Sequence, residues 1–181
     1  MQQENSVGDR RGKELLGMTV YSVQEGKRLG EVTALLVRRE NSSVAAIRIG
    51  SQLTLGPAVA YVDLRLVGID VILVESESML RKEISADEAR TLDDRVPGRP
   101  VFTASGVRVG TVSGFWVHTD TGQIAAYRVR PETGLLSRLA RVVRSDSMDI
   151  PVEQVHSLGA DALVVSDAVM SVRDEVPEAQ A

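Results

Sequence analysis

Several residue types are rare in this 181-residue chain, and each shortage narrows its chemistry. The sequence has no cysteine, which excludes disulfides, thiolate nucleophiles, iron–sulfur clusters and cysteine-based zinc sites. Only two histidines are present, His118 and His156. A metal centre formed by His118 with Asp120 would lack the spaced ligand set of known zinc or iron sites. We therefore expect neither a metal nor a cofactor.

Long apolar runs are lacking as well. The densest one, residues 64–74, is interrupted by Arg65 and Asp70 and falls far short of the roughly 18 residues that span a bilayer. The polar stretch 1–14 has no apolar core of the kind found in secretory signals. The formal net charge of −4 gives no general attraction to nucleic acid or anionic lipid. These features predict a cytoplasmic protein without an integral membrane segment.

The chain contains an internal repeat. Residues 26–32 (Gly-Lys-Arg-Leu-Gly-Glu-Val) match residues 106–112 (Gly-Val-Arg-Val-Gly-Thr-Val) at an offset of 80, and residues 44–49 match 124–129 at the same offset. Farther along, residues 68–74 match 159–165 at an offset of 91, so the second copy carries an 11-residue insertion. A repeat of this length is the size of a small domain, and we expect two homologous domains.

The repeat and the local charge divide the chain into segments. Each copy balances its charges, whereas the acidic excess lies between the copies and after the second one. The sequence Ser-x-x-Glu at 85–88 is typical of a capping box and predicts a short helix between the copies. The predicted segments are a disordered tail (1–14), domain 1 (15–75), a connector (76–95), domain 2 (96–167) and an acidic tail (168–181).

Within each copy, short runs of apolar and β-branched residues alternate with turn residues, which is typical of strands. The clearest predicted strands are residues 44–49 and 124–129, preceded by 32–37 and 112–117, and the last strands are 71–74 and 163–165. Five or six short strands in about 60 residues, without a long helical pattern, indicate a small barrel or rolled sheet. The expected fold class is all-β, with two tandem small open β-barrels joined by a short, partly helical connector.

The order of features in each copy resembles that of the PRC-barrel domain family. It runs from Gly-x-x-Val-aromatic through Gly-x-x-x-Gly-x-Val and a strand with paired alanines to Gly-x-Asp before the final strand, and it covers about three quarters of the chain. The resemblance implies a small open β-barrel that serves as a binding or assembly module. It leaves the pathway open, because one fold can carry many functions.

The glycine and carboxylate motifs are better explained by turns than by catalysis. No Gly-x-Ser-x-Gly elbow occurs, and the paired glycines run into strands rather than opening a helix, as a phosphate loop does. We expect no catalytic, cofactor-binding or metal-binding residue, and therefore no enzyme. The predicted structural turn residues are Gly26, Gly30, Gly68, Asp70, Gly106, Gly110, Gly159 and Asp161.

Two features of the second copy are candidate interaction sites. Within the insertion, Arg138, Arg141 and Arg144 lie three residues apart among leucines and valines. As a helix, this element could contact an acidic protein surface or a phosphate backbone; as a strand pair of the barrel, it would only expose solvated arginines. Trp116 faces away from its neighbour Phe115 on a predicted strand, either covered or serving as an interface anchor.

These observations favour a non-enzymatic protein-interaction or assembly module whose partner is another protein. The alternative is an RNA- or ribosome-associated accessory factor that uses the Arg138–Arg144 element. A homo-oligomer is a further option, because open barrels leave strand edges to be covered. We also expect the two barrels to pack against each other, with Trp116 or Leu36 in the shared surface, since a domain of about 60 residues is marginal alone.

Overall fold

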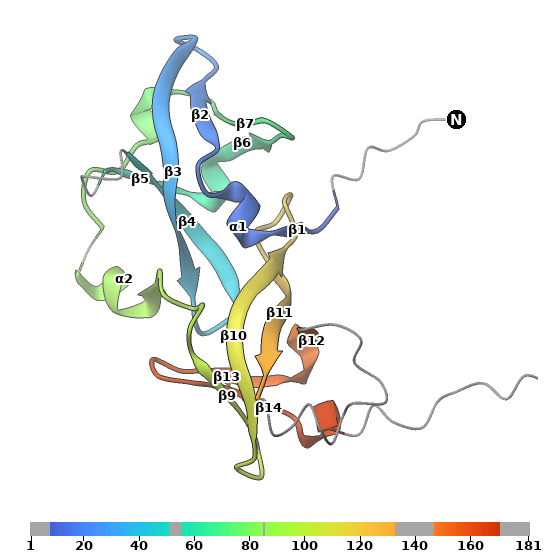
Figure 1. The fold of residues 1–181 in the computed structure, drawn as a ribbon. Helices are drawn as coiled ribbons and strands as arrows, with labels where there is room; N and C mark the ends of the chain where they lie inside the picture. Colours follow the sequence, from blue (N-terminus) through green and yellow to red (C-terminus); the bar gives the residue numbers. More distant parts are fainter. Residues whose placement is uncertain (1–7, 51–55, 85, 133–146, 171–181) are drawn as a thin grey trace, which may run out of the picture.

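The computed structural model describes residues 8–50, 56–84, 86–132 and 147–170. They form two sheets, which occupy the upper and lower halves of Figure 1. The helices are α1 (Gly12–Leu15) and α2 (Ala86–Thr91), and the 3-10 turns are η1 (Tyr61–Asp63), η2 (Glu77–Met79), η3 (Val152–Gln154) and η4 (Asp167–Met170). The predicted all-β class is confirmed, and a short helix lies between the copies. The capping serine predicted for that helix, Ser85, lies outside the described residues.

The first copy forms an open barrel. Its strands are β2 (Thr19–Ser22), β3 (Lys27–Arg38), β4 (Ser43–Gly50), β5 (Ala58–Ala60), β6 (Leu64–Val67) and β7 (Val71–Val74). Their order in the sheet is β5-β4-β3-β2-β7-β6, with every pair antiparallel except β2 and β7. Because β5 and β6 end this path without pairing with each other, the barrel does not close.

The second copy repeats this topology. Its strands are β9 (Pro100–Thr103), β10 (Arg108–Val117), β11 (Ile124–Pro131), β12 (Met148–Pro151), β13 (Val155–Leu158) and β14 (Leu163–Val165). The order β12-β11-β10-β9-β14-β13, with β14 parallel to β9, matches the first sheet strand for strand. The predicted strands 44–49, 124–129, 71–74 and 163–165 are confirmed. The insertion falls between β11 and β12, and its residues 133–146 lie outside the described chain.

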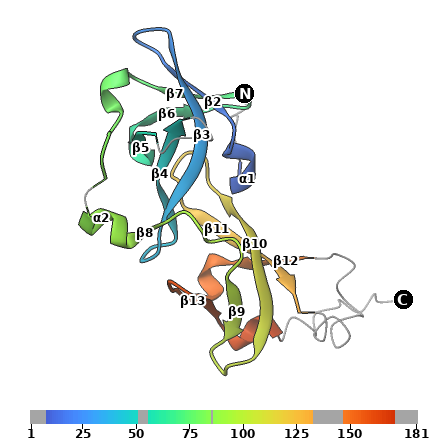
Figure 2. The same cartoon turned by 60° about the vertical axis from the view of Figure 1, so that its left-hand side comes forward.

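The short strand that precedes each barrel pairs with a strand of the other barrel. Strand β1 (Arg10–Arg11), which precedes the first barrel, pairs with β10 of the second, so that Arg11 lies opposite Trp116. Strand β8 (Leu92–Asp93), which precedes the second barrel, pairs with β3 of the first. Figure 1 labels β1 near the end of β10, and Figure 2 labels β8, which follows α2 on its way to the second sheet. We call this arrangement the strand exchange.

A disordered tail was predicted over residues 1–14, but residues 10–14 are ordered by the strand exchange, while residues 1–7 lie outside the described chain. Residues 10–11 form β1 and residues 12–15 form α1, where Gly12 packs so closely on Phe115 that a Cβ would lie 2.6 Å from its ring. This segment is ordered because it pairs with a strand far away in the sequence. Its own sequence has no periodic pattern of apolar residues that would have predicted a helix or strand. At the other end, residues 168–170 of the predicted acidic tail belong to η4, and Val169 is buried.

The two barrels share one hydrophobic core, so their predicted packing is confirmed. The core includes Val20 and Ile72 of the first copy together with Val101 and Leu163 of the second. Backbone hydrogen bonds join the copies symmetrically, because Val44 N–H donates to Gly122 O (2.8 Å) and Ile124 N–H donates to Ser42 O (2.9 Å). These residues occupy equivalent places in the repeat, and the contact is therefore a pseudo-twofold one.

Two tyrosines add polar contacts between the barrels. The Tyr61 hydroxyl donates to the Thr119 carbonyl oxygen (2.9 Å), and the Tyr127 hydroxyl donates to Ser42 Oγ (3.0 Å). Burial raises the pKa of each tyrosine to about 12, so both stay neutral and able to donate at physiological pH. The hydroxyl groups thus donate to buried acceptors that would otherwise have no hydrogen-bond partner in the interface.

Trp116 and Leu36, the residues expected in the shared surface, contact the exchanged strands but do not belong to the shared core. Leu36 belongs to a separate small cluster with Ala46 and Ala58, under Ile84 and Leu92 of the connector. Trp116 is half-buried and is not among the core residues, whereas its neighbour Phe115 is. Strand alternation explains the difference, since one residue of an adjacent pair must face outward and the inward one here is Phe115.

Candidate interaction surface

Gly26 and Gly106 lie in the turns of the β2–β3 and β9–β10 hairpins, whereas Gly30 and Gly110, also predicted as turn residues, lie within β3 and β10. Gly26 and Gly106 have φ angles of +58° and +85°, in the left-handed region that favours glycine. Gly30 and Gly110 follow on the second strand of each hairpin, and a Cβ on Gly110 would lie 2.1 Å from the Arg130 carbonyl oxygen. The two glycines of each motif therefore allow a tight reversal followed by a close approach of strands.

The two Gly-x-Asp sequences form the turns before β7 and β14. An arginine from the same half of the chain secures each turn, because Arg10 donates to the Gly68 carbonyl oxygen (2.7 Å) and Arg99 donates to that of Gly159 (2.5 Å). Arg99 also forms a buried ion pair with Asp93 of β8. Asp70 and Asp161 are exposed on these turns, and a turn-stabilising role for their carboxylates stays a prediction.

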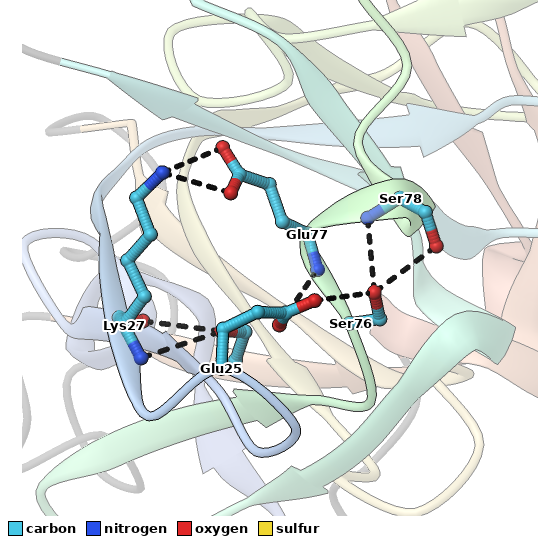
Figure 3. A network of polar contacts seen from close by, with 6 residues as sticks. Glu25, Lys27, Ser76, Glu77 and Ser78 are labelled. Carbon is cyan, nitrogen blue, oxygen red and sulfur yellow. Dashed lines mark hydrogen bonds and ion pairs between the residues drawn. The ribbon is translucent and has the colours of Figure 1, made fainter.

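A polar cluster fastens the β2–β3 hairpin to η2 (Figure 3). Ser76 Oγ donates to Glu25 Oε1 (2.8 Å), the Glu77 N–H donates to Glu25 Oε2 (3.2 Å), and Lys27 Nζ lies 2.8 Å from a Glu77 carboxylate oxygen. Hydrogen bonds from Ser22 and Ser76 hold the pKa of Glu25 below its ordinary value of 4.5. The carboxylate accepts these bonds as an anion, and the cluster ties the hairpin to the end of β7.

The second barrel has an equivalent cluster with the carboxylate on the opposite side. There Ser105 stands on the hairpin and Asp167 on the turn, and the Ser105 N–H and Oγ donate to Asp167 Oδ1 over 3.2 and 2.5 Å. These bonds lower the pKa of Asp167 as well. We call the two clusters the clasps.

The histidines lie in different surroundings. His118 forms a close contact with Asp9, while His156 stands on β13 near Asp167. Among the described residues, no group of three or more histidines and carboxylates has a metal-binding arrangement.

A basic hollow surrounds Trp116 on the outer face of the second barrel. The residues around the ring are Arg11 from β1, Lys13 from α1, and Arg128 and Arg130 from β11. We call Trp116 and these four residues the Trp116 surface. Together with small residues such as Ser113, they line a hollow of about 270 Å³. Two parts of the chain that are far apart in the sequence meet here, because the strand exchange brings β1 and α1 to β10 and β11.

The Trp116 ring is braced by arginines. The guanidinium carbons of Arg128 and Arg11 lie over the ring at 5.2 and 6.0 Å from its centroid, within the range of a cation–π interaction. Arg128 also donates two hydrogen bonds to Asp149 (2.9 and 3.0 Å). Those bonds, with a smaller contribution from the Trp116 side chain, lower the pKa of Asp149. The ring is thus held in a fixed position.

The positive charge of this surface is only partly neutralised. Arg11 pairs with Glu14 (Nε to Oε1, 2.7 Å) and Arg128 pairs with Asp149. Lys13 and Arg130 have no ion pair within the part of the chain that the structure describes, and both are exposed. The surface therefore presents two cations beside two internal ion pairs.

The first barrel has Arg48 at the position of Arg128 but lacks the rest of this arrangement. Leu36 corresponds to Trp116 at the offset of 80 and is only 4% exposed, while Gly50 stands at the position of Arg130. The connector residues Ile84 and Leu92 cover Leu36. The Trp116 surface is therefore specific to the second copy and does not follow from the barrel fold itself.

A groove between the barrels continues the hollow. It has a volume of about 330 Å³ and shares Lys13, Gly114 and Phe115 with the hollow. Strands β3 and β10 each carry a bulge there, after Val32 and after Val112, which bends both strands at the groove. Leu16, which is 46% exposed, adds apolar surface to its wall.

The sequence motifs located only part of this surface. Trp116 was a candidate, but its basic neighbours were not. Arg128 and Arg130 are two residues apart at the end of a predicted strand and must share a face, a signal that could have identified them. Arg11 and Lys13 come from a segment expected to be disordered. The other candidates, Arg138, Arg141 and Arg144, lie outside the described residues.

The comparisons with known proteins agree with the geometry. Among the described residues, no helix combines the length and apolar character needed to cross a bilayer. No curated protein matches the chain. The PRC-barrel domain pattern matches twice, over residues 8–86 and 92–167, and these matches correspond to the two sheets. This chain therefore belongs to the PRC-barrel domain family, with two tandem copies of the domain.

Proposed function

We propose that this protein is a non-enzymatic interaction or assembly module that binds another protein through the Trp116 surface. PRC-barrel domains are small, generally non-catalytic interaction modules. The observation that carries the proposal is Trp116 itself, braced by Arg11 and Arg128 at a position where the first copy buries a leucine. Tryptophan and arginine are the residues most enriched at binding hot spots.

The packing of the two barrels supports this role because it orders the Trp116 surface before a partner binds. The strand exchange places Arg11 and Lys13 on the second barrel, and the shared core fixes the barrels relative to each other. A surface ordered before binding loses less conformational entropy when the partner arrives.

Replacing Trp116 by leucine tests the proposal, since it installs the residue that the first copy has at this position. Wild-type and W116L proteins are immobilised, exposed to lysate of the native source, and the captured proteins are quantified by mass spectrometry. We expect W116L to lose at least one partner that wild type retains. Phe102→Leu, which truncates a half-buried aromatic on β9, is the control and retains it. Identical captured proteins on wild type and W116L would contradict the proposal.

An RNA- or ribosome-associated role is the second candidate. It was based on Arg138, Arg141 and Arg144, and the basic charge of the Trp116 surface adds support from described residues. Binding of single-stranded RNA that weakens steeply with salt favours this role, and the absence of binding at low salt excludes it.

A further inference from the structure

We infer that the Trp116 surface recognises an acidic peptide segment, with carboxylates paired to Lys13 and Arg130 and an apolar side chain in the adjoining groove. This inference rests on the proposed function, because it assigns a partner chemistry to the same surface. It also makes the groove between the barrels part of the binding site.

The internal ion pairs show which chemistry the surface accepts. Arg128 already holds a carboxylate through two parallel hydrogen bonds to Asp149, and Arg11 holds another through Glu14. Lys13 and Arg130 line the same hollow and have no such partner among the described residues. Charge-assisted hydrogen bonds to carboxylates are the strongest contacts that these two side chains can form.

The groove supplies the apolar part of the site, and the two carboxylates that also line it, Asp93 and Asp94, are each paired with an arginine. It shares Lys13 and Phe115 with the hollow, so a segment bound across the boundary contacts both. Leu16 is 46% exposed on its wall, and covering this side chain removes apolar surface from water. The matching segment therefore carries an apolar residue next to its carboxylates.

Two observations favour a peptide over a nucleic acid. The guanidinium groups of Arg11 and Arg128 already lie over the Trp116 ring, which leaves less of its face for the stacking that single-stranded nucleic acids require. The chain also carries a formal net charge of −4, which opposes a long polyanion more than a short segment with local carboxylates.

Fluorescence gives a direct test, because Trp116 is the only tryptophan of the chain. The 181-residue chain is titrated with a synthetic peptide of glutamates around one leucine, with the same peptide carrying lysines instead, and with oligouridylate of equal length. We expect the glutamate peptide alone to produce a saturable change in emission. Its affinity should fall as salt rises from about 0.05 M to about 0.3 M.

Charge reversal identifies the site. The variant K13E/R130E should bind the glutamate peptide about tenfold more weakly or worse, while K82E/R28E, which changes net charge equally at exposed positions outside the Trp116 surface, should bind as wild type does. The milder K13A/R130A variant should show a smaller loss, and circular dichroism checks that all variants are folded.

The outcomes separate this inference from the proposed function. If W116L loses its protein partner but the glutamate peptide leaves Trp116 emission unchanged, the acidic segment is wrong and the interaction surface stands. Peptide binding that K13E/R130E does not weaken overturns the assignment of the two cations. If oligouridylate binds more tightly than the glutamate peptide, the inference is wrong and the surface is a nucleic-acid site.

Discussion

At the scale of single residues, the two copies use equivalent positions for different tasks. Position 36 holds a leucine beneath the connector, whereas position 116 holds a tryptophan among arginines. Ser42 and Gly122 are equivalent as well, and both give a carbonyl oxygen to the contact between the barrels. Gly122 also lies against Tyr61, with its backbone in the left-handed region at φ +74°.

Gly122→Ala should therefore weaken the contact between the barrels. An added Cβ would lie 2.7 Å from the Tyr61 ring and 2.8 Å from the Val44 carbonyl oxygen. Backbone strain and overpacking together should lower the free energy of unfolding by about 2–4 kcal/mol. Urea denaturation measures the loss.

Gly106→Ala is the matched control for this substitution. Gly106 has a comparable φ of +85°, but a Cβ there meets nothing within 4 Å. The cost should be limited to strain, at about 1 kcal/mol. Equal losses for the two variants would show that the contact of Gly122 with Tyr61 and Val44 does not matter.

At the scale of elements, each clasp joins a hairpin to the turn after the last strand of its barrel. Glu25 is on the hairpin in the first copy, and Asp167 is on the turn in the second. Serine hydroxyls donate to both carboxylates, so the two copies keep the same bond with its members exchanged.

Because of the clasps, the free energy of unfolding should decrease as the pH falls. Because the folded protein lowers the pKa of Glu25 and Asp167, their contribution is fully present above the ordinary values of 4.5 and 3.8 and is lost as pH falls through the lowered values. Urea midpoints of wild type and of E25Q/D167N, measured between about pH 7 and about pH 2, should differ most at neutral pH and converge in acid. A gap of constant size across this range would contradict an ionic role.

Much of the fold could be predicted from the sequence because its signals are local. Strands such as 44–49 and 124–129 are short, mostly apolar runs that follow turn residues, and the repeat assigns them equivalent places in two sheets. The hairpin glycines mark the reversals between them. Together these signals predict the barrels, the number of copies and the location of the insertion.

The strand exchange could not be predicted in the same way. Strands β1 and β8 have two residues each, too few to show a period, and each is ordered by a partner far along the chain. The Trp116 surface depends on this exchange for Arg11 and Lys13. The sequence pattern therefore identified the tryptophan but none of the four cations around it, and for Arg11 and Lys13 it carries no signal that could have done so.

At the scale of the whole molecule, the shared core and the strand exchange make the two barrels one unit. We expect a single unfolding transition, with Trp116 emission and far-ultraviolet circular dichroism changing together. Ile72→Ala removes buried volume from β7 of the first barrel, at a cost of about 2–5 kcal/mol. The substitution should shift both signals equally, although Trp116 lies in the second barrel.

Independent barrels would behave differently. In that case Ile72→Ala would destabilise only the first copy, and the midpoint reported by Trp116 would stay where it is in wild type. Two separate transitions in the wild-type protein would lead to the same conclusion.

The strand exchange also has a consequence for the order of events during synthesis. Arg10 emerges from the ribosome long before its partner Val117, and β3 waits for Leu92 to complete its edge. The strand that completes the first barrel is translated before the second barrel, whereas β1 must stay unpaired until β10 has been translated. Because such distant pairings must form last, the nascent chain exposes unpaired strand edges for longer than a barrel made from contiguous residues.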